Sequence, residues 1–199
     1  MSFFAKLFFS LPRISDSLLK PFLWFYMFSQ NVEFNSFPRI SGKPIIVNLG
    51  KIKLGNNVII TSRLSGNPVG GKNKTCLYTT KTGNIIIADN VALSNVVIYS
   101  MEHIEINKDV LIGGGAQIFD TDFHSLKFDD RILNKDSIIK TASVVIEEGA
   151  FIGTNCLILK GVTIGRKSIV AAGSVVTKSI PGNEIWGGNP AKFIKKIKQ

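Results

Sequence analysis

The most regular stretch of the chain is a six-residue pattern of aliphatic residues that runs from residue 146 to residue 181. Ile or Val stands at every sixth position, and a mostly small residue follows four places later. A helix needs apolar spacings of three and four and a flat strand needs alternation, and neither fits a period of six. A fixed short period is typical of a β-solenoid. The aliphatic positions are Ile146, Ile152, Ile158, Ile164, Val170 and Val176.

Each six-residue row is expected to form one short strand and one corner. The aliphatic residue points inward, where its burial stabilises the fold by about 1.5–3 kcal/mol. The small fifth residue points inward beside the corner, and the fourth residue takes the turn. Gly and Asn at the fourth position, as at Gly149 and Asn155, tolerate a left-handed backbone that costs other residues roughly 1–2 kcal/mol. Three rows would close one triangular coil; the alternative, a β-sandwich, would show turn-residue clusters instead of a fixed spacing.

The same rows extend upstream with interruptions. The pattern begins irregularly, with a two-residue slip after Ile46, and Asn57 takes the turn position of its row. It resumes at Ile87 and reaches Ile118 with a one-residue slip. The predicted solenoid covers residues 37–183, with excursion loops at residues 63–84 and 119–141.

The two ends of the chain lack rows. Residues 1–36 form a separate segment, and the aromatic runs within residues 1–30 are too short to span a bilayer, which takes about twenty residues. No secretory signal pattern is present. Two interpretations stay open and are compatible: a helical cap over the open end of the solenoid, or an aromatic, basic helix on a membrane surface. Residues 184–199 are predicted to form a tail that ends in a short basic helix.

Composition narrows the classes of partner. The 199 residues, 45% of them hydrophobic, suit one globular domain. Lys and Arg number 24 against 14 acidic residues, and the net charge of +10 favours an anionic ligand or a membrane surface. The basic residues are scattered and no nucleic-acid-binding module is recognised, so nucleic acid is not expected as a partner. Cys76 and Cys156 show neither zinc spacing nor a disulfide pattern, which indicates a reducing compartment, and Cys156 occupies an inward position.

The second excursion loop carries the candidate chemistry. His124 follows Asp122 by two residues and Asp120 by four. An imidazole beside a carboxylate is a usual pair for general-base catalysis near neutral pH. On the residues alone, a surface histidine in a hydrophilic loop is the favoured interpretation over a general base, and the spacing does not choose between the two aspartates. The other histidine, His103 beside Glu102, is interpreted as structural.

Two segments resemble the bacterial hexapeptide-repeat acyltransferases: the rows from Ile152 to Lys178, and the motif Gly188-Asn-Pro-Ala-Lys192. The segment from Ile118 to His124 is similar to that of the sugar O-acetyltransferases that modify surface polysaccharides. The resemblance implies an all-β fold, a left-handed parallel β-helix with an N-terminal helical segment and a short C-terminal helix. It also implies a homotrimer with sites between neighbouring coils, acetyl-CoA as donor substrate, and no metal.

The resemblance also assigns roles to individual residues. His124 matches the catalytic base. Its partner is not given by the resemblance; Asp122 is taken as the candidate, with Asp120 left open. Ser125 stands where the maltose and galactoside enzymes usually have Pro, a difference that bears on the acceptor rather than on the histidine. The remaining assignments are Thr154 and Ala172 to the thioester channel, Thr177 and Lys178 to the pantetheine and phosphate end, Lys192 to the nucleotide, and Asn95 to the acceptor side.

We therefore expect an acetyl-CoA-dependent O-acetyltransferase that acts on a sugar hydroxyl in O-antigen, capsule or exopolysaccharide biosynthesis. Transfer would be direct, in a ternary complex, in the cytoplasm or at the inner face of the cytoplasmic membrane. One alternative is N-acetylation of an amino sugar on the same fold. A γ-type carbonic anhydrase would need three histidines around zinc, and the chain has two. A non-catalytic membrane-bound scaffold is a further alternative.

Overall fold

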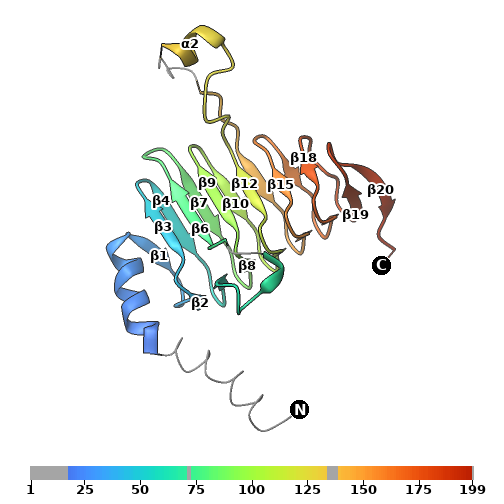
Figure 1. The fold of residues 1–199 in the computed structure, drawn as a ribbon. Helices are drawn as coiled ribbons and strands as arrows, with labels where there is room; N and C mark the ends of the chain where they lie inside the picture. Colours follow the sequence, from blue (N-terminus) through green and yellow to red (C-terminus); the bar gives the residue numbers. More distant parts are fainter. Residues whose placement is uncertain (1–17, 71–72, 134–138, 199) are drawn as a thin grey trace.

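The computed structural model describes residues 18–70, 73–133 and 139–198. Residues 1–17, the first part of the predicted N-terminal segment, lie outside these ranges. The described chain winds into a three-sided prism of parallel strands (Figure 1), the predicted left-handed parallel β-helix. Each coil contributes one strand to each of three sheets, called faces A, B and C here.

The strands of each face are stacked in chain order. Face A contains β1 (Val32–Phe34), β4 (Lys51–Leu54), β7 (Asn84–Ile87), β10 (Ile104–Ile106), β13 (Val144–Ile146) and β16 (Thr163–Ile164). Face B contains β2 (Arg39–Gly42), β5 (Ile59–Ser62), β8 (Ala92–Ser94), β11 (Leu111–Ile112), β14 (Phe151–Ile152), β17 (Ile169–Val170), β19 (Glu184–Gly187) and β20 (Lys192–Lys196). Face C contains β3 (Ile45–Asn48), β6 (Cys76–Thr79), β9 (Val97–Ser100), β12 (Gln117–Phe119), β15 (Leu157–Ile158) and β18 (Val175–Val176).

The six-residue rows determine this geometry. Ile146 pairs with Ile164, and Ile152 pairs with Val170, so successive coils are offset by the expected eighteen residues. All six aliphatic positions of the regular rows are at most 1% exposed. Five of the six fourth positions turn with positive φ, as predicted, and Ser179 in the last row does not; the five are Gly149, Asn155, Gly161, Lys167 and Gly173.

The N-terminal helix closes one end of the prism. Residues 18–29 are helical, and Leu23 and Met27 are buried in the core. The hydroxyl of Tyr26 accepts a hydrogen bond from the backbone N–H of Ile46 at 2.9 Å and donates to its carbonyl at 3.2 Å. Because this hydroxyl satisfies part of the edge of β3, the helix is fastened to the first coil. In the described part of the chain, no helix is both long and apolar enough to cross a bilayer.

Two loops leave the coils, and the first is shorter than predicted. Strand β6 lies within the predicted loop at residues 63–84, so the excursion covers residues 63–75. The row was missed because its single buried aliphatic residue, Leu77, has glycine rather than an aliphatic residue six positions before and after it, at Gly71 and Gly83. The second loop, called the arm here, covers residues 120–143. It includes α2 (Phe128–Ile132) and projects well away from the prism (Figure 1).

The predicted C-terminal helix is wrong. Residues Lys192–Lys196 form β20, which pairs antiparallel with β19 and extends face B. The last coil would otherwise leave the backbone N–H and C=O groups of β19 unpaired, and a paired strand removes this edge. Phe193 also packs edge-on against Trp186, with ring centroids 6.4 Å apart.

Candidate active site

The arm begins with a strained turn that presents His124. The chain leaves β12 at the edge between faces C and A, and the backbone N–H of His124 donates to the carbonyl of Asp122 at 2.7 Å. Phe123, between them, has a φ of +63°. A three-residue turn with positive φ is rare, and for a bulky residue it costs on the order of 1–3 kcal/mol. The side chain of His124 is exposed, so the strain maintains an accessible imidazole.

Aromatic packing compensates for this strain. The ring of Phe123 lies 4.9 Å from that of Tyr99 and 5.1 Å from that of Phe119, and Tyr99 stacks on Tyr78 at 4.6 Å. Such pairs contribute about 0.5–1.5 kcal/mol each beyond burial. Burial, together with the nearby Tyr78 and Asp120, raises the pKa of Tyr99 above 10.0, so the phenol stays neutral. The aromatic cluster therefore anchors the turn to face C.

The sequence interpretation did not include this cluster, although a signal for it exists. Tyr78, Tyr99 and Phe119 each follow a buried aliphatic residue by one position, which places them on the outer side of three successive strands. Because successive side chains alternate between the two sides of a strand, this offset predicts a stack of rings.

The two aspartates that the sequence could not distinguish have different environments. Asp120 is fully buried, and its carboxylate accepts hydrogen bonds from Ser100 Oγ at 2.7 Å and from the backbone N–H groups of Met101 and Glu102 at 2.8 and 2.9 Å. Asp120 thus fastens the preceding coil to the start of the arm. Its oxygens are committed to these donors, which leaves Asp122 as the carboxylate available to the turn.

Asp122 connects the turn to the next coil. Its Oδ1 lies 2.7 Å from Nζ of Lys160, just after β15, and both side chains are largely covered. Its Oδ2 is buried and accepts no hydrogen bond within the described residues. A buried carboxylate oxygen without a donor retains acceptor capacity for a proton or for a bound group. Lys160 was not among the predicted site residues.

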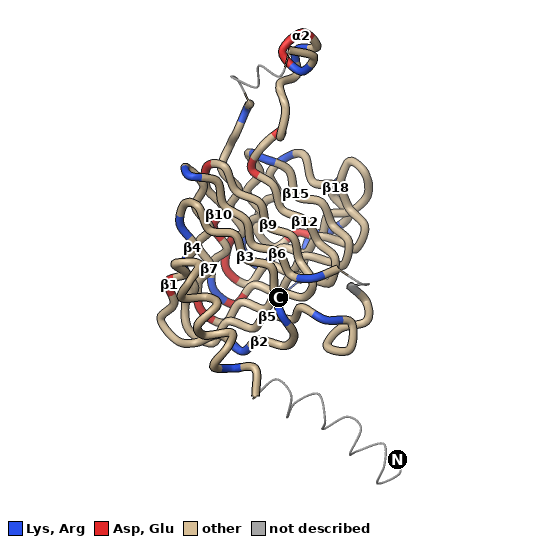
Figure 2. The backbone as a smooth tube through the Cα atoms, turned by 60° about the vertical axis from the view of Figure 1, so that its left-hand side comes forward, with Lys and Arg blue, Asp and Glu red and all other residues tan. Residues whose placement is uncertain are grey.

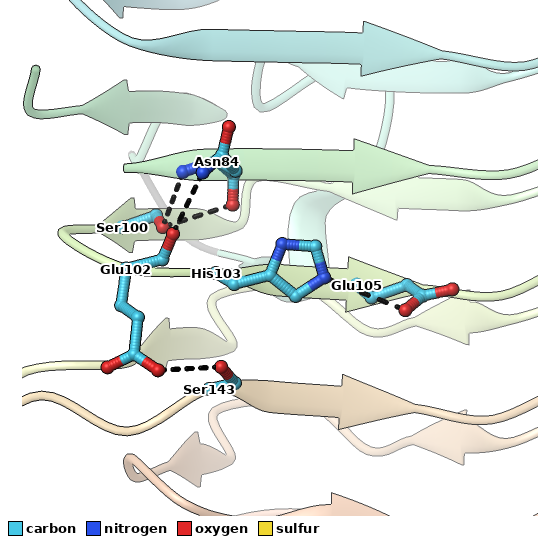
Figure 3. Close-up of polar contacts among 6 residues, drawn as sticks. All are labelled: Asn84, Ser100, Glu102, His103, Glu105 and Ser143. Carbon is cyan, nitrogen blue, oxygen red and sulfur yellow. Dashed lines mark hydrogen bonds and ion pairs between the residues drawn. The ribbon is translucent and has the colours of Figure 1, made fainter. Parts of the chain in front are cut away.

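The second histidine lies on a different face. His103 Nε2 is 3.6 Å from Glu105 Oε2 on the outer side of face A (Figure 3). The neighbouring Glu102 accepts a hydrogen bond from Ser143 Oγ at 2.8 Å, and hydrogen bonds from Thr141 and Ser143 hold the pKa of its carboxyl below the ordinary 4.5. The contacts of Glu102 tie the base of the arm to the chain just before β10. Among the described residues, no group of three or more His, Cys, Asp or Glu side chains could hold a metal ion.

Three of the predicted donor-binding residues meet in one cavity. It has a volume of about 350 Å³ and lies at the C-terminal end of the prism, with Trp186 and Phe193 in its wall. Two cations beside a hydroxyl and aromatic rings suit a phosphorylated nucleotide. The predicted residues that line it are Thr177, Lys178 and Lys192.

The other predicted residues lie along the edge between faces B and C. Ala172 and Thr154 stack in successive coils, since the N–H of Gly173 donates to the carbonyl of Thr154 at 2.8 Å. Asn95 is on the same edge, but it is buried and its Nδ2 donates to the carbonyl of Asn67 at 3.2 Å, which fastens the first excursion. Its Oδ1 has no hydrogen-bond partner in the described chain.

Within one chain, the predicted site residues therefore lie in two groups on different edges of the prism. The turn of His124 and the residues Thr177 and Lys178 follow β12 and β18 on the edge between faces C and A, two strand spacings or about 10 Å apart. Thr154 and Ala172 lie on a different edge of the prism. Cys156, close to Thr154 in the chain, is buried, burial raises the pKa of its thiol, and its Sγ donates to the carbonyl of Ala171 at 3.1 Å.

Comparison with known proteins matches the same region. A family described as the hexapeptide repeat of succinyl-transferase matches residues 143–178. The chain is 36% identical over 120 residues to a protein of Escherichia coli K12 named as lipopolysaccharide biosynthesis O-acetyl transferase WbbJ, an alignment that covers 57% of this chain and 61% of that protein. The chain spans about 60% of the length of this relative and of a second, a Saccharomyces cerevisiae protein named as acetyltransferase YJL218W.

Two solved structures extend the comparison. A hexapeptide-repeat-containing acetyltransferase from Vibrio cholerae is 33% identical, with 61% of this chain and 68% of that chain covered and a TM-score of 0.49. A mutant form of AntD, an N-acyltransferase from Bacillus cereus solved in complex with dTDP and coenzyme A, is 26% identical, with 84% of each chain covered and a TM-score of 0.65.

Proposed function

Since the chain belongs to the hexapeptide-repeat acyltransferases, we propose that it transfers an acetyl group from acetyl-CoA to a sugar hydroxyl in surface-polysaccharide biosynthesis. The similarity to a protein named for lipopolysaccharide O-acetylation supports this acceptor class. The observation that carries the proposal is the pairing, along one edge of the prism, of an exposed histidine on a strained turn with a cationic cavity.

The proposed step is direct transfer with His124 as general base. Its imidazole removes the proton from the sugar hydroxyl as the oxygen attacks the carbonyl carbon of the thioester. The C–S bond then breaks, and the sulfur of CoA leaves with the proton that the imidazolium returns. General-base catalysis of this kind contributes about 10²–10⁴-fold. Asp122, fixed by its ion pair with Lys160, holds the turn that carries the imidazole.

The donor is proposed to lie with its charged end in the cavity. Lys178 and Lys192 supply point charges for phosphates, and the Thr177 hydroxyl supplies a hydrogen-bond donor. Trp186 and Phe193 offer ring faces to the adenine base. AntD, the N-acyltransferase described above, was crystallised with coenzyme A, which supports the same ligand class here.

We propose that the complete site forms between copies of the chain. Thr154 and Ala172 lie on the edge between faces B and C, whereas His124 lies on the edge between faces C and A. A contact that joins two different edges is head-to-tail, and it closes into a ring when the rotation allows. A homotrimer of three-sided prisms would bring one copy's histidine against the next copy's thioester channel three times.

The test is turnover of acetyl-CoA with a panel of simple sugars, nucleotide sugars and lipid-linked oligosaccharides. His124→Ala should lower transfer by about 10²–10⁴-fold, because the base is lost, while calorimetry still detects CoA binding. His103→Ala, at the other histidine of the chain, is the matched control and should keep wild-type turnover. Failure of the wild-type protein to transfer acetyl to any acceptor, or full activity of His124→Ala, would refute the proposal.

N-acetylation of an amino sugar is the second candidate, and the 26% identity to an N-acyltransferase over 84% of each chain favours it. The fold, donor and base would be the same. Product analysis separates the two reactions, since mild alkali hydrolyses an acetyl ester and leaves an acetamide intact.

A further inference from the structure

The N-terminal helix is apolar on both of its faces. Leu23 and Met27 point into the prism and account for its capping role. The outer face is also apolar, and Trp24 and Phe28 stack there with ring centroids 5.5 Å apart. Contiguous exposed apolar clusters mark interaction sites. The exposed members, called the aromatic surface here, are Leu18, Leu19, Phe22, Trp24, Phe25 and Phe28, with exposures of 40–78%.

A basic cavity adjoins the aromatic surface. It has a volume of about 310 Å³, and its polar lining comprises Lys20, Arg39, Ser36 and Asn57, without a carboxylate. Neither Lys20 nor Arg39 forms an ion pair with any residue in the described ranges. Two cations beside a hydroxyl and an amide form a setting in which phosphate oxygens bind.

The described part of the N-terminal helix carries charge of one sign. Lys20 is the one charged residue within residues 18–29, and Figure 2 shows basic but no acidic positions along the described part of the helix. Lys43 adds a third cation, since its Nζ lies 5.1 Å from the ring centroid of Phe22 and 5.4 Å from that of Tyr26. By contrast, α2 on the arm carries residues of both signs (Figure 2).

From these two features we infer that this end of the prism docks onto an anionic phospholipid bilayer. The aromatic surface enters the boundary between headgroups and acyl chains, where Trp and Phe rings are favoured. A lipid phosphate occupies the basic cavity between Lys20 and Arg39. A second copy of the chain fits this surface less well, because a two-fold contact would bring like cations together in a desolvated interface.

End-on docking gives the molecule an orientation. The basic cavity and the cavity lined by Lys178 and Lys192 lie at opposite ends of the prism. The membrane would therefore contact the first coil, while the last coil stays open to water-soluble ligands. The inference depends only on the N-terminal helix and the first coils, and it holds whatever reaction the chain performs.

The experiment is flotation of the full-length protein with vesicles of phosphatidylcholine, alone or with about one third phosphatidylglycerol. The double variant Lys20→Gln, Arg39→Gln should bind the anionic vesicles about 25-fold more weakly, since each surface cation contributes about fivefold. Trp24→Ser with Phe25→Ser should abolish binding to both vesicle types. The matched control is Lys127→Gln with Phe128→Ser on the arm, where Phe128 is 66% exposed, and it should bind as the wild type does.

Each outcome decides the inference. Wild-type protein that fails to float with anionic vesicles overturns it, as does equal loss of binding in the arm control. A wild-type oligomer that the Trp24→Ser, Phe25→Ser variant dissociates without lipid assigns the aromatic surface to a second copy instead. If the Trp24→Ser, Phe25→Ser variant unfolds, the single variant Phe25→Ser replaces it, because Phe25 is 65% exposed. His124→Ala should float normally, which separates this inference from the proposed transferase activity.

Discussion

At the scale of single residues, the turn from Asp122 to His124 concentrates strain where the proposed chemistry takes place. Phe123 adopts a φ of +63°, which glycine would adopt without cost, yet the position carries a large ring. The ring is retained, in this interpretation, because its contacts with Tyr99 and Phe119 fix the direction in which the turn points. The direction of the turn and the backbone strain at Phe123 thus both depend on the Phe123 side chain.

Replacing Phe123 separates these two consequences. Phe123→Ala loses two aromatic contacts, about 1–3 kcal/mol of stability, and keeps the strained φ; we expect kcat to fall tenfold or more as the turn loosens. Phe123→Gly loses the same contacts but relieves the strain, and it should be roughly 1 kcal/mol more stable than the Ala variant with equally low kcat. Urea unfolding and steady-state kinetics measure both effects. Unchanged kcat in Phe123→Ala would show that the ring does not position His124.

Part of the candidate site was predictable at this scale and part was not. The spacing of His124 from Asp120 and Asp122 identified the group but could not select one carboxylate, because burial and backbone donors separate them only in the folded chain. The ion pair with Lys160 joins residues 38 positions apart, across the arm and into the next coil, and nothing local in the sequence indicates it.

At the scale of elements, the arm depends on its attachment to the prism. The outgoing and returning segments of the arm pair at an isolated antiparallel bridge between Thr121 and Thr141. Glu102, on the preceding coil, accepts hydrogen bonds from Thr141 and Ser143. These bonds favour the ionised carboxylate, so the pKa of Glu102 is lower in the folded state than its ordinary 4.5.

The lowered pKa makes this attachment sensitive to acid. A carboxyl whose folded pKa is depressed stabilises the fold at pH values above its unfolded pKa, and this contribution is lost as the pH falls through the folded pKa. Wild-type stability should therefore decline on going from about pH 6 to about pH 3.5 more steeply than that of Glu102→Gln. Urea midpoints at each pH measure this, and Ser143→Ala should flatten the profile in part. Parallel wild-type and Glu102→Gln profiles would contradict the assignment.

Elements whose inward positions repeat were predictable from the sequence, because each row contains its own strand, turn and spacing. The turn positions of the first five regular rows were predicted correctly, even Lys167, which adopts a φ of +55°. Elements that form only because they pair with a neighbouring strand were not predictable from the sequence. Strand β6 has one buried aliphatic residue and exists by pairing with β3 and β9, and β20 has no buried residue and exists by pairing with the edge of β19.

At the scale of the whole molecule, the prism distributes functional residues over separate edges and ends. The aromatic surface lies at the first coil, the cationic cavity at the last, and the proposed base and thioester channel on different edges between them. A solenoid cannot bend to bring its own edges together, since its parallel ladders are continuous along all three faces. A second copy of the chain is the simplest way to complete such a site.

Subunit mixing tests this directly. Ala172→Trp places a bulky ring in the proposed thioester channel at an exposed position, so it should abolish transfer without unfolding the chain. His124→Ala abolishes transfer from the other edge. Trimers formed by co-refolding equal amounts of the two inactive variants should recover about one quarter of wild-type activity, because one site in four would combine an intact histidine from one copy with an intact channel from the next.

The recovery separates the two arrangements sharply. If both halves of a site came from the same chain, every site in a mixed trimer would carry one defect and activity would stay at the background of the single variants. Light scattering must find trimers for each variant and for the mixture; a monomeric wild-type protein with full activity would refute the shared site outright. A mixture of His124→Ala with His103→Ala is the control for assembly: half of its sites would keep His124, whichever chain supplies the channel, so about half of wild-type activity should remain.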